Sequence, residues 1–355
     1  MKQSEKGYNR IVIKIGSSLF FSDGINPDFK NLNNITKQII HLVKEGKEVL
    51  VVSSGAIACG MSLLGLESRP QELSCLQAIA AIGQHKLMSV YSEAFKEKGL
   101  NSAQVLLTWE DFDSRKRYLN AKNTLLTLLK LGSIPIINEN DTVSTDEIKF
   151  GDNDRLSALV SSLVSADLLI ILSDVDGLLD KDNKTVIRII DEITLELKAL
   201  ACPTNKKTSV GGMITKIEAA KIAVDSGIPC VIANGRKPDI IFSIIKEPEK
   251  EGTLFLPKKA LAAKKRWIAF GAKPKGKIIV DEGAKKALLN KKSLLAVGIV
   301  ATQGVFEAGD IVSVQDLHNH EFARGRVAIS SKQLGKVKGR LYSKEIIHCD
   351  NIVIK

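Results

Sequence analysis

Short apolar runs alternate with longer amphipathic stretches through the first 235 residues, and this alternation limits the possible folds more than any other feature of the sequence. Most of the runs end in Gly, Ser, Asn or Asp, and apolar residues recur at helical spacing in the stretches between them. The predicted strands are 10–18, 48–53, 102–108, 133–138, 166–174 and 228–235, and the predicted helices are 31–45, from 56, 75–98, 115–131, 153–165 and from 211. Such alternation predicts an α/β domain in which helices cover both faces of a mainly parallel sheet, a three-layer αβα sandwich.

Polar residues stand where four of the predicted strands end. They are Gly16-Ser17, Ser54-Gly55, Asn138–Asp141 and Ser173-Asp174. Because ligands of parallel sheets bind beyond the carboxyl ends of the strands, we expect these residues to converge on one site. A purely structural turn is the alternative at Ser54-Gly55.

Lys14 interrupts the apolar run of the first strand. A lysine in a core strand costs several kcal/mol unless its ammonium reaches a polar site or an anion. The alternative is a lysine at the edge of the sheet that faces water. Gly16 and Ser17 favour the first interpretation, since small residues and free N–H groups at a strand end approach phosphate closely.

The stretch 138–154, NENDTVSTDEIKFGDND, is dense in carboxylates and carboxamides and begins where an apolar strand ends. That position indicates a site for a polar substrate, and a solvated acidic loop is the alternative. Its middle part, Val143–Phe150, is either a hairpin that covers the substrate or a regulatory loop.

Gly211-Gly212 opens a predicted helix that carries Lys216 in its first turns. Orphan N–H groups, the helix dipole and an ammonium would then meet at one point, which predicts an anion site. The spacing of a Walker A loop is absent.

The charge of the chain divides unevenly along its length. Residues 258–355 hold 20 Lys and Arg against 8 Asp and Glu, a balance of +12, whereas the whole chain of 355 residues carries +11. This asymmetry predicts a separate C-terminal module with an anionic partner, or else a solvated or subunit-contacting surface. We therefore expect a domain at 1–257, a basic linker at 258–275 and a β-rich, barrel-like module at 276–355.

The rest of the composition predicts a cytoplasmic protein that has no membrane segment. No apolar run is long enough to span a bilayer, and the polar N-terminus lacks the pattern of a signal peptide. The five cysteines are scattered without metal-ligand spacing, which argues against zinc and disulfides.

Five segments, in this order, resemble the glutamate 5-kinases of the amino-acid kinase family. They are IVIKIGSS, VVSSGAIACG, INENDTVSTDEIKFGDNDRLSALV, ILSDVDGL and GGMITKIEAAKIA. The C-terminal part, with VDEGAKKALLNKKSLLAVGIV and GVFEAGDIVSV, is similar to a PUA domain. The resemblance implies the amino-acid kinase fold and the ATP-dependent phosphorylation of the L-glutamate side-chain carboxylate, the first step of proline biosynthesis.

The resemblance also implies roles for individual residues. Lys14 and Lys216 match the catalytic lysines, and Asp154 matches the aspartate that orients them. Asp141 matches the acceptor of the substrate ammonium. Ser54, Gly55 and Asn153 match the residues that donate hydrogen bonds to the substrate carboxylates. The expected ATP-binding residues are Lys14, Gly16, Ser17, Ser173, Asp174, Gly211, Gly212, Met213, Thr215 and Lys216.

Further expectations come from the resemblance alone. They are Mg²⁺ carried on ATP with no direct protein ligand, proline as feedback inhibitor, a homo-oligomer (dimer or tetramer), and RNA as a partner of the PUA domain. Ser209-Val210 replaces the Gly-Thr that usually precedes Gly-Gly-Met, so no phosphate contact is assigned to Val210. The alternatives are another phosphotransferase of the same family and an RNA-binding protein built on a kinase-like scaffold.

Overall fold

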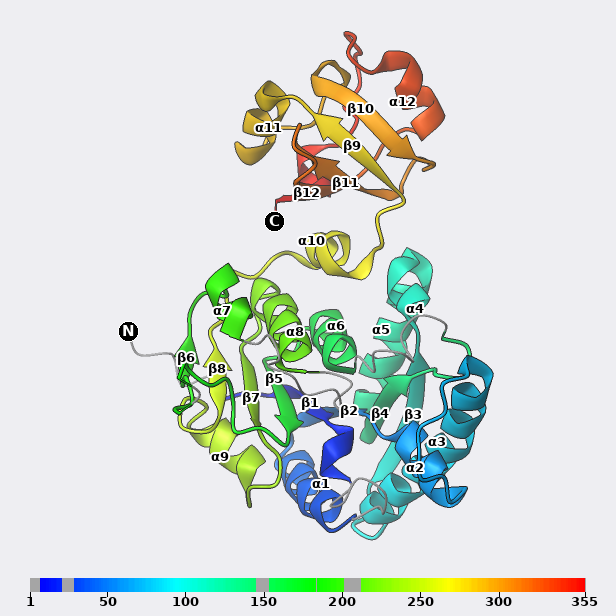
Figure 1. The fold of residues 1–355 in the computed structure, drawn as a ribbon, viewed down its shortest axis with the longest axis vertical. Helices are drawn as coiled ribbons and strands as arrows, with labels where there is room; N and C mark the ends of the chain where they lie inside the picture. Colours follow the sequence, from blue (N-terminus) through cyan, green and yellow to red (C-terminus); the bar gives the residue numbers. More distant parts are fainter. Residues whose placement is uncertain (1–6, 21–28, 145–152, 183, 201–211, 355) are drawn as a thin grey trace. The chain divides into compact units, whose positions relative to one another are not determined.

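The computed structural model of the chain describes residues 7–20, 29–144, 153–182, 184–200 and 212–354 (Figure 1). The chain divides into two compact units. The first unit comprises residues 1–111 and 119–260, and the second comprises 112–118 and 261–355. No helix within the described ranges is both long and apolar enough to cross a membrane.

An eight-stranded sheet forms the centre of the described part of the first unit, in the order β3-β4-β2-β1-β5-β7-β8-β6. Every pairing is parallel except that of β7 with β8. The strands are β1 (Arg10–Ile15), β2 (Glu48–Ser53), β3 (Asn101–Leu107), β4 (Ser133–Glu139), β5 (Leu168–Ser173), β6 (Ile189–Ile190), β7 (Cys230–Asn234) and β8 (Thr253–Phe255). The predicted mainly parallel α/β fold is confirmed.

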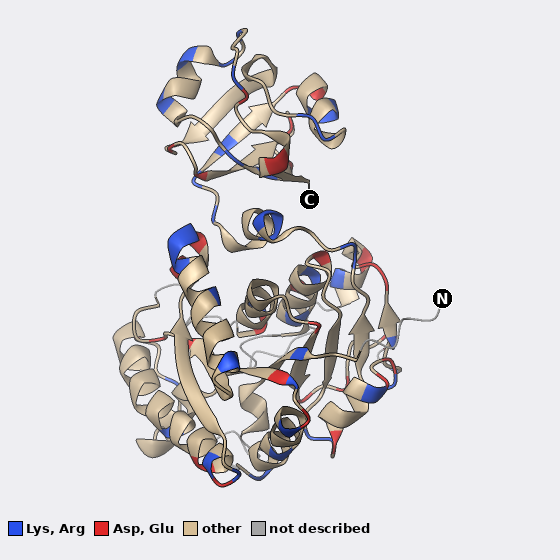
Figure 2. Ribbon diagram, turned by 180° about the vertical axis from the view of Figure 1, so that it is seen from behind, with Lys and Arg blue, Asp and Glu red and all other residues tan. Residues whose placement is uncertain are grey.

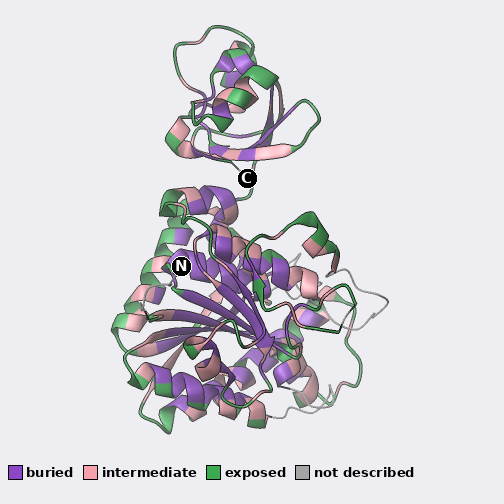
Figure 3. Ribbon diagram, turned by 90° about the vertical axis from the view of Figure 1, so that its left-hand side faces the viewer, coloured by how far each residue is buried: buried purple, intermediate pink, exposed green. Residues whose placement is uncertain are grey.

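Helices cover both faces of this sheet, with α1 and α9 on one side and α6 and α8 on the other (Figure 1). The helices of the first unit include α1 (Phe29–Lys44), α2 (Ala56–Leu63), α3 (Leu73–Lys96), α6 (Asn153–Val164), α7 (Leu195–Leu200), α8 (Met213–Asp225) and α9 (Ile240–Lys246). The helices α4 (Trp109–Asp113) and α5 (Arg115–Lys130) each have residues in both units. The central strands are buried, as the purple ribbons of Figure 3 show.

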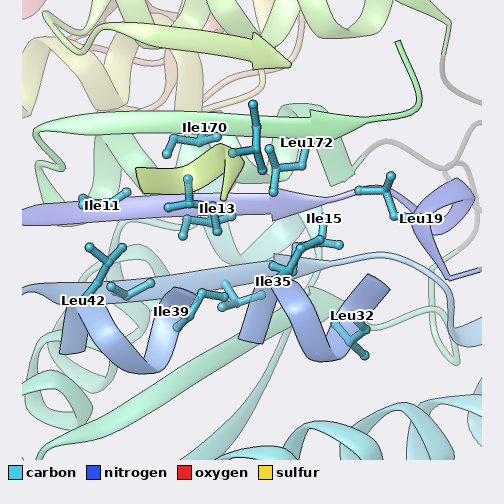
Figure 4. Packing of buried hydrophobic residues seen from close by; sticks show 14 of the residues in the cluster. Ile11, Ile13, Ile15, Leu19, Leu32, Ile35, Ile39, Leu42, Ile170 and Leu172 are labelled. Atoms are coloured by element: carbon cyan, nitrogen blue, oxygen red, sulfur yellow. The ribbon is translucent and has the colours of Figure 1, made fainter. Parts of the chain in front are cut away.

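The two-residue period of β1 decides which side chains enter which layer. Ile11, Ile13 and Ile15 pack with residues of α1, among them Ile35 and Ile39 (Figure 4). Lys14 has the opposite parity and therefore belongs to the other face, the face covered by α6 and α8.

The second unit is built on a five-stranded sheet in the order β10-β9-β11-β12-β13. Its pairings are antiparallel except for β9 with β11. The elements are β9 (Gly276–Val280), α11 (Glu282–Leu289), β10 (Ile299–Gly304), β11 (Ile311–Gln315), β12 (Glu321–Arg326), α12 (Ser331–Val337) and β13 (Ile352–Ile354). Figure 2 shows Lys and Arg on both helices of this unit, where the sequence places Lys285, Lys286, Lys332 and Lys336.

The stretch expected as a basic linker contains regular structure. It holds α10 (Ala263–Arg266) and a π-helix (Trp267–Gly271). Trp267 is buried, and its Nε1 donates to the Phe112 carbonyl at 2.9 Å. Asp113 accepts from the Lys273 N–H and from Lys275 Nζ, each at 2.8 Å. Residues 112–118 therefore belong to the second unit because their partners lie about 155 residues further along the chain.

Candidate functional site

Asp154 joins two lysines from different elements. Lys14 comes from β1 and Lys216 from the second turn of α8, whereas Asp154 is the second residue of α6. Lys14 Nζ lies 2.6 Å from Asp154 Oδ1, and Lys216 Nζ lies 3.3 Å from Asp154 Oδ2. All three side chains are buried, so one carboxylate holds two ammonium groups side by side and leaves one positive charge in excess.

Burial and neighbouring charges shift the pKa values of Asp154 and Lys216. Burial alone would raise the pKa of the Asp154 carboxyl, but the charges of Lys14 and Lys216 and the hydrogen bonds outweigh burial, so the pKa lies below its ordinary value of 3.8. Burial lowers the pKa of the Lys216 ammonium below 10.5, while Asp154 opposes the shift and Lys14 adds to it. The ammonium of Lys216 is thus held in place at an energetic cost that an anionic ligand would relieve.

Thr215 adds a third donor to the same carboxylate. Its hydroxyl lies 2.8 Å from Asp154 Oδ2 and 2.9 Å from the carbonyl of Gly212, the N-cap residue of α8. Gly212 supplies no side-chain cap, so among the described residues no cap side chain occupies the first-turn N–H groups of α8, which suit a phosphate. Met213 begins this helix. Gly211, Ser209 and Val210 lie outside the described residues.

Asn153 is fixed by three acceptors around one atom. Its Nδ2 lies 3.2 Å from the Ser53 carbonyl, 3.0 Å from Ser54 Oγ and 2.8 Å from Asn138 Oδ1. Asn138 is fixed in turn, because its own Nδ2 donates to Gln84 at 2.8 Å. These contacts assign the amide orientation of Asn153 and leave its buried Oδ1 without a hydrogen-bond partner among the described residues. The atom of the Asn153 amide that can still form a hydrogen bond is therefore the acceptor Oδ1, which suits a substrate ammonium better than a substrate carboxylate.

A pocket of about 100 Å³ lies beside the lysine cluster. Five residues expected at the site line it, namely Ser17, Ser54, Gly55, Asp141 and Asn153. The remaining lining residues are Ala56, Ile57, Ala58, Arg69, Asn138 and Glu139. Lys14, Asp154 and Lys216 are not among them. Since Asn153 and Asp154 are consecutive, the start of α6 joins the pocket to the lysine cluster.

Close packing of two helices supports one wall of the pocket. A Cβ on Gly83 of α3 would lie 1.8 Å from the Ala56 carbonyl oxygen, and one on Gly60 of α2 would lie 2.0 Å from the Ile79 carbonyl oxygen. Only glycine permits backbones to approach this closely. The crossing holds the first turn of α2, including Ala56 and Ile57, against the pocket.

Ser173 and Asp174 lie at the end of β5, one strand away from Lys14. Ser173 is buried and its hydroxyl donates to Asp174 Oδ1 at 3.0 Å. The charge of Asp174 acts on Lys216, so these residues belong to the same neighbourhood as the lysine cluster. Gly16 is also close, since its N–H donates to the Leu172 carbonyl at 3.0 Å.

The sequence analysis missed Arg69 and gave Glu139 no role of its own. Glu139 is buried and accepts from the Ser144 hydroxyl at 2.7 Å. It was expected at the site only as part of the range Asn138–Asp141. Arg69 lies between α2 and α3, where no periodicity or glycine pattern draws attention to it. Of the segment Val143–Phe150, only Val143, which is exposed, and Ser144, which is buried, lie among the described residues.

Comparisons with known proteins agree with this architecture. Residues 9–234 match the Amino acid kinase family, and residues 276–349 match the PUA domain. Glutamate 5-kinase of Caldanaerobacter subterraneus subsp. tengcongensis is 48% identical, and that of Thermoanaerobacter sp. (strain X514) is 46% identical, each over 97% of both chains. Glutamate 5-kinase of Dehalococcoides mccartyi is 43% identical over 99% of this chain and 100% of its own.

Among solved structures, UMP kinase from Bacillus anthracis matches 72% of this chain and 99% of its own, with 16% identity and a TM-score of 0.48. The family match covers well over half of the chain, and the relatives match it from end to end. The chain therefore belongs to the amino acid kinase family and is similar over its whole length to proteins named glutamate 5-kinase.

Proposed function

We propose that the chain transfers the γ-phosphoryl group of ATP to the side-chain carboxylate of L-glutamate, giving L-glutamyl 5-phosphate and ADP in the first step of proline biosynthesis. Relatives named glutamate 5-kinase, 43–48% identical over nearly the full length, support the substrate. The observation that carries the chemistry is Asp154 between two buried lysines, next to a pocket lined by Asp141 and Asn153.

The proposed reaction needs charge neutralisation more than proton transfer. A carboxylate nucleophile with a pKa of about 4.3 is already ionised at neutral pH, so no general base has to be found. Both oxygens of Asp154 are engaged by the lysines and Thr215, which suits a holder of cations rather than a base. Lys14 and Lys216 would stabilise the negative charge that gathers on the transferring phosphoryl group and on the leaving ADP.

The ion pairs of Asp154 with the two lysines also affect how Mg²⁺ can bind at the site. Because each oxygen of Asp154 forms an ion pair with an ammonium group, the carboxylate is a poor metal ligand, and the site fits Mg²⁺ that arrives on the phosphates of ATP. Bound in this way, the ion neutralises phosphate charge. The proposed nucleotide contacts are Ser173, Asp174, Gly16, Ser17 and the first turn of α8, including Gly212, Met213 and Thr215.

Substrate selection follows from the acceptors of the pocket. Asp141 and the unpartnered Oδ1 of Asn153 suit the ammonium of glutamate, while Ser54 and the N–H of Gly55 suit a carboxylate. N-acetylglutamate should fail, because its amide cannot neutralise Asp141 in a partly dehydrated pocket.

The test is ADP release with L-glutamate, combined with trapping of the acyl phosphate by hydroxylamine as a hydroxamate. Aspartate, carbamate, UMP and N-acetylglutamate serve as competing acceptors. ADP release that depends on L-glutamate supports the proposal. Preference for another acceptor would move the protein to a different activity of the family, and no ATP turnover at all would favour the scaffold alternative.

The remaining expectations concern partners and boundaries. We propose a catalytic domain at 1–257 and a PUA domain at 276–355, a cytoplasmic location, a homo-oligomer, feedback inhibition by proline and RNA as the anionic partner of the basic module. The charge balance of +12 in residues 258–355 supports an anionic partner. RNA affinity that falls steeply with salt would bear this out, whereas affinity independent of salt would not.

A further inference from the structure

Two charged residues of the pocket, Arg69 and Glu139, have no role in the reaction proposed above. Arg69 is the only cationic side chain among the described residues that line the pocket, whose other charged lining residues are Glu139 and Asp141. A ligand with two carboxylates would enter a cavity in which the lining carboxylates outnumber the cations. A cation at the pocket wall is therefore needed where a ligand carboxylate comes to rest.

Arg69 and Asp141 act on one another. Partial desolvation lowers the pKa of the Arg69 guanidinium, although its side chain is exposed, while the carboxylate of Asp141 lies close enough to favour the charged form. An α-amino acid carries the same two charges, an ammonium and a carboxylate, on adjacent atoms. It presents a positive group to Asp141 and a negative group to Arg69, so each protein charge gains a ligand partner without a change in total charge.

The position of Arg69 decides which carboxylate of the substrate it meets. The carboxylate that reacts must face Lys14 and Lys216, and neither lysine lines the pocket. Arg69 lies outside the lysine cluster, in the connection between α2 and α3. Asn153 adds a second requirement, because its buried Oδ1 has no hydrogen-bond partner in the described part of the chain, and the substrate ammonium supplies a donor.

We propose that Arg69 recognises the α-carboxylate of the substrate while Asp141 and Asn153 Oδ1 recognise its ammonium, so that this group of residues selects free α-amino acids. The inference rests on the proposed reaction and adds to it a specificity-determining residue. Guanidinium offers two parallel donors to a carboxylate, a geometry that lysine lacks. Ala56, Ile57 and Ala58 of the first turn of α2 also line this pocket, and N–H groups at the start of a helix are suitable donors to a carboxylate.

The test compares L-glutamate with its 1-amide, in which the α-carboxylate is neutral and the side-chain carboxylate is intact. We expect the unaltered chain to prefer glutamate by about 10–100-fold in kcat/KM, the scale of one or two charge-assisted hydrogen bonds. Arg69→Gln should lose most of that factor with glutamate and little with the amide, so the preference collapses. Arg69→Lys should fall between the two. Where turnover of the amide is too slow, its inhibition constant against glutamate replaces kcat/KM.

The controls separate this inference from the proposed reaction. Arg117→Gln makes the same change at an exposed arginine of α5 that does not line the pocket, and it should leave both substrates unaffected. If the unaltered chain does not release ADP with glutamate, the proposed reaction fails. If it does, but Arg69→Gln weakens glutamate and the amide equally, or neither, then Arg69 does not recognise the α-carboxylate and the inference is overturned.

Discussion

The crossing of α2 and α3 allows a quantitative prediction for Gly83→Ala. The new Cβ would lie 1.8 Å from the Ala56 carbonyl oxygen and 2.3 Å from the Gly60 nitrogen, both of them backbone atoms. Real Cβ contacts essentially never fall below 3.0 Å, so the two helices must separate by at least 1.2 Å, the difference between 3.0 and 1.8 Å. No side-chain rotation relieves a clash between a Cβ and a backbone.

Two effects oppose each other in this substitution. Alanine favours a helix interior over glycine by about 1 kcal/mol. Overpacking costs about 1–3 kcal/mol, and a forced backbone shift puts the cost near the upper end. The clash therefore dominates, and we expect a net loss of about 2 kcal/mol, or about 4–8 °C in Tm for a unit of this size.

The same shift should reach the pocket, because Ala56 is both the residue that the new Cβ strikes and a residue of the pocket wall. A misplacement of about 1 Å can cost up to about 10²-fold in catalytic efficiency, so we expect kcat/KM for glutamate to fall by about 10–100-fold, mainly through KM because Ala56 lines the pocket. Thermal unfolding and steady-state kinetics measure the two effects on one preparation.

Gly335→Ala is the matched control. Gly335 lies within α12, and nothing stands within 4 Å of a Cβ built on it, so the same substitution should be neutral or stabilising by up to about 1 kcal/mol. A Gly83→Ala variant with unchanged Tm and unchanged KM would show that the helices do not approach as closely as described.

Three further predictions concern the lysine cluster and the second unit. Lys14→Met and Lys216→Met should each lower kcat by about 10²–10³-fold, the usual scale for one preorganised electrostatic donor, and near-normal turnover in either would contradict the assignment. Because the pKa of Lys216 is lowered from 10.5, the activity that depends on its ammonium should fall as the pH rises through this lowered pKa, before pH 10.5 is reached; Lys216→Arg should remove this alkaline limb from the pH–rate profile, and an unchanged limb would assign it to another group. A chain that ends after residue 275 should unfold at a higher temperature than one that ends after 257, because residues 267–275 hold Phe112 and Asp113; equal Tm values would make those contacts unimportant.

Much of the central sheet could be predicted because its signals are local. The second predicted strand, 48–53, coincides with β2, and the helix expected from Ala56 begins there. By contrast, β6 and β8 contain two and three residues, too few to show a period. They exist because β6 pairs with β8 and β8 pairs with β7, and no local pattern predicts such pairing. The contact of Trp267 with Phe112 could not be predicted for the same reason, since the two residues are 155 positions apart in the sequence.

The candidate site divides along the same line. Lys14, Asp154 and Lys216 stand at strand and helix ends that the sequence marks with glycine or acidic residues, and the structure brings them into contact. Arg69 could not be found in this way, because its place at the pocket depends on how the α2–α3 pair packs. The orientation of the Asn153 amide likewise depends on Ser53 and Asn138, which approach it only in the folded chain.

The burial of α6 has a consequence for motion. Every residue of this helix except Arg155 is buried, and the helix packs against α8 and the central strands. Amide hydrogens beyond its first turn should therefore exchange with deuterium only when much of the first unit opens, which makes α6 one of its slowest-exchanging segments. Asp154 belongs to this helix, so its carboxylate keeps a fixed position relative to the central sheet during the proposed phosphoryl transfer. Any closure around the substrates must bring the other residues to Asp154 rather than move Asp154 to them.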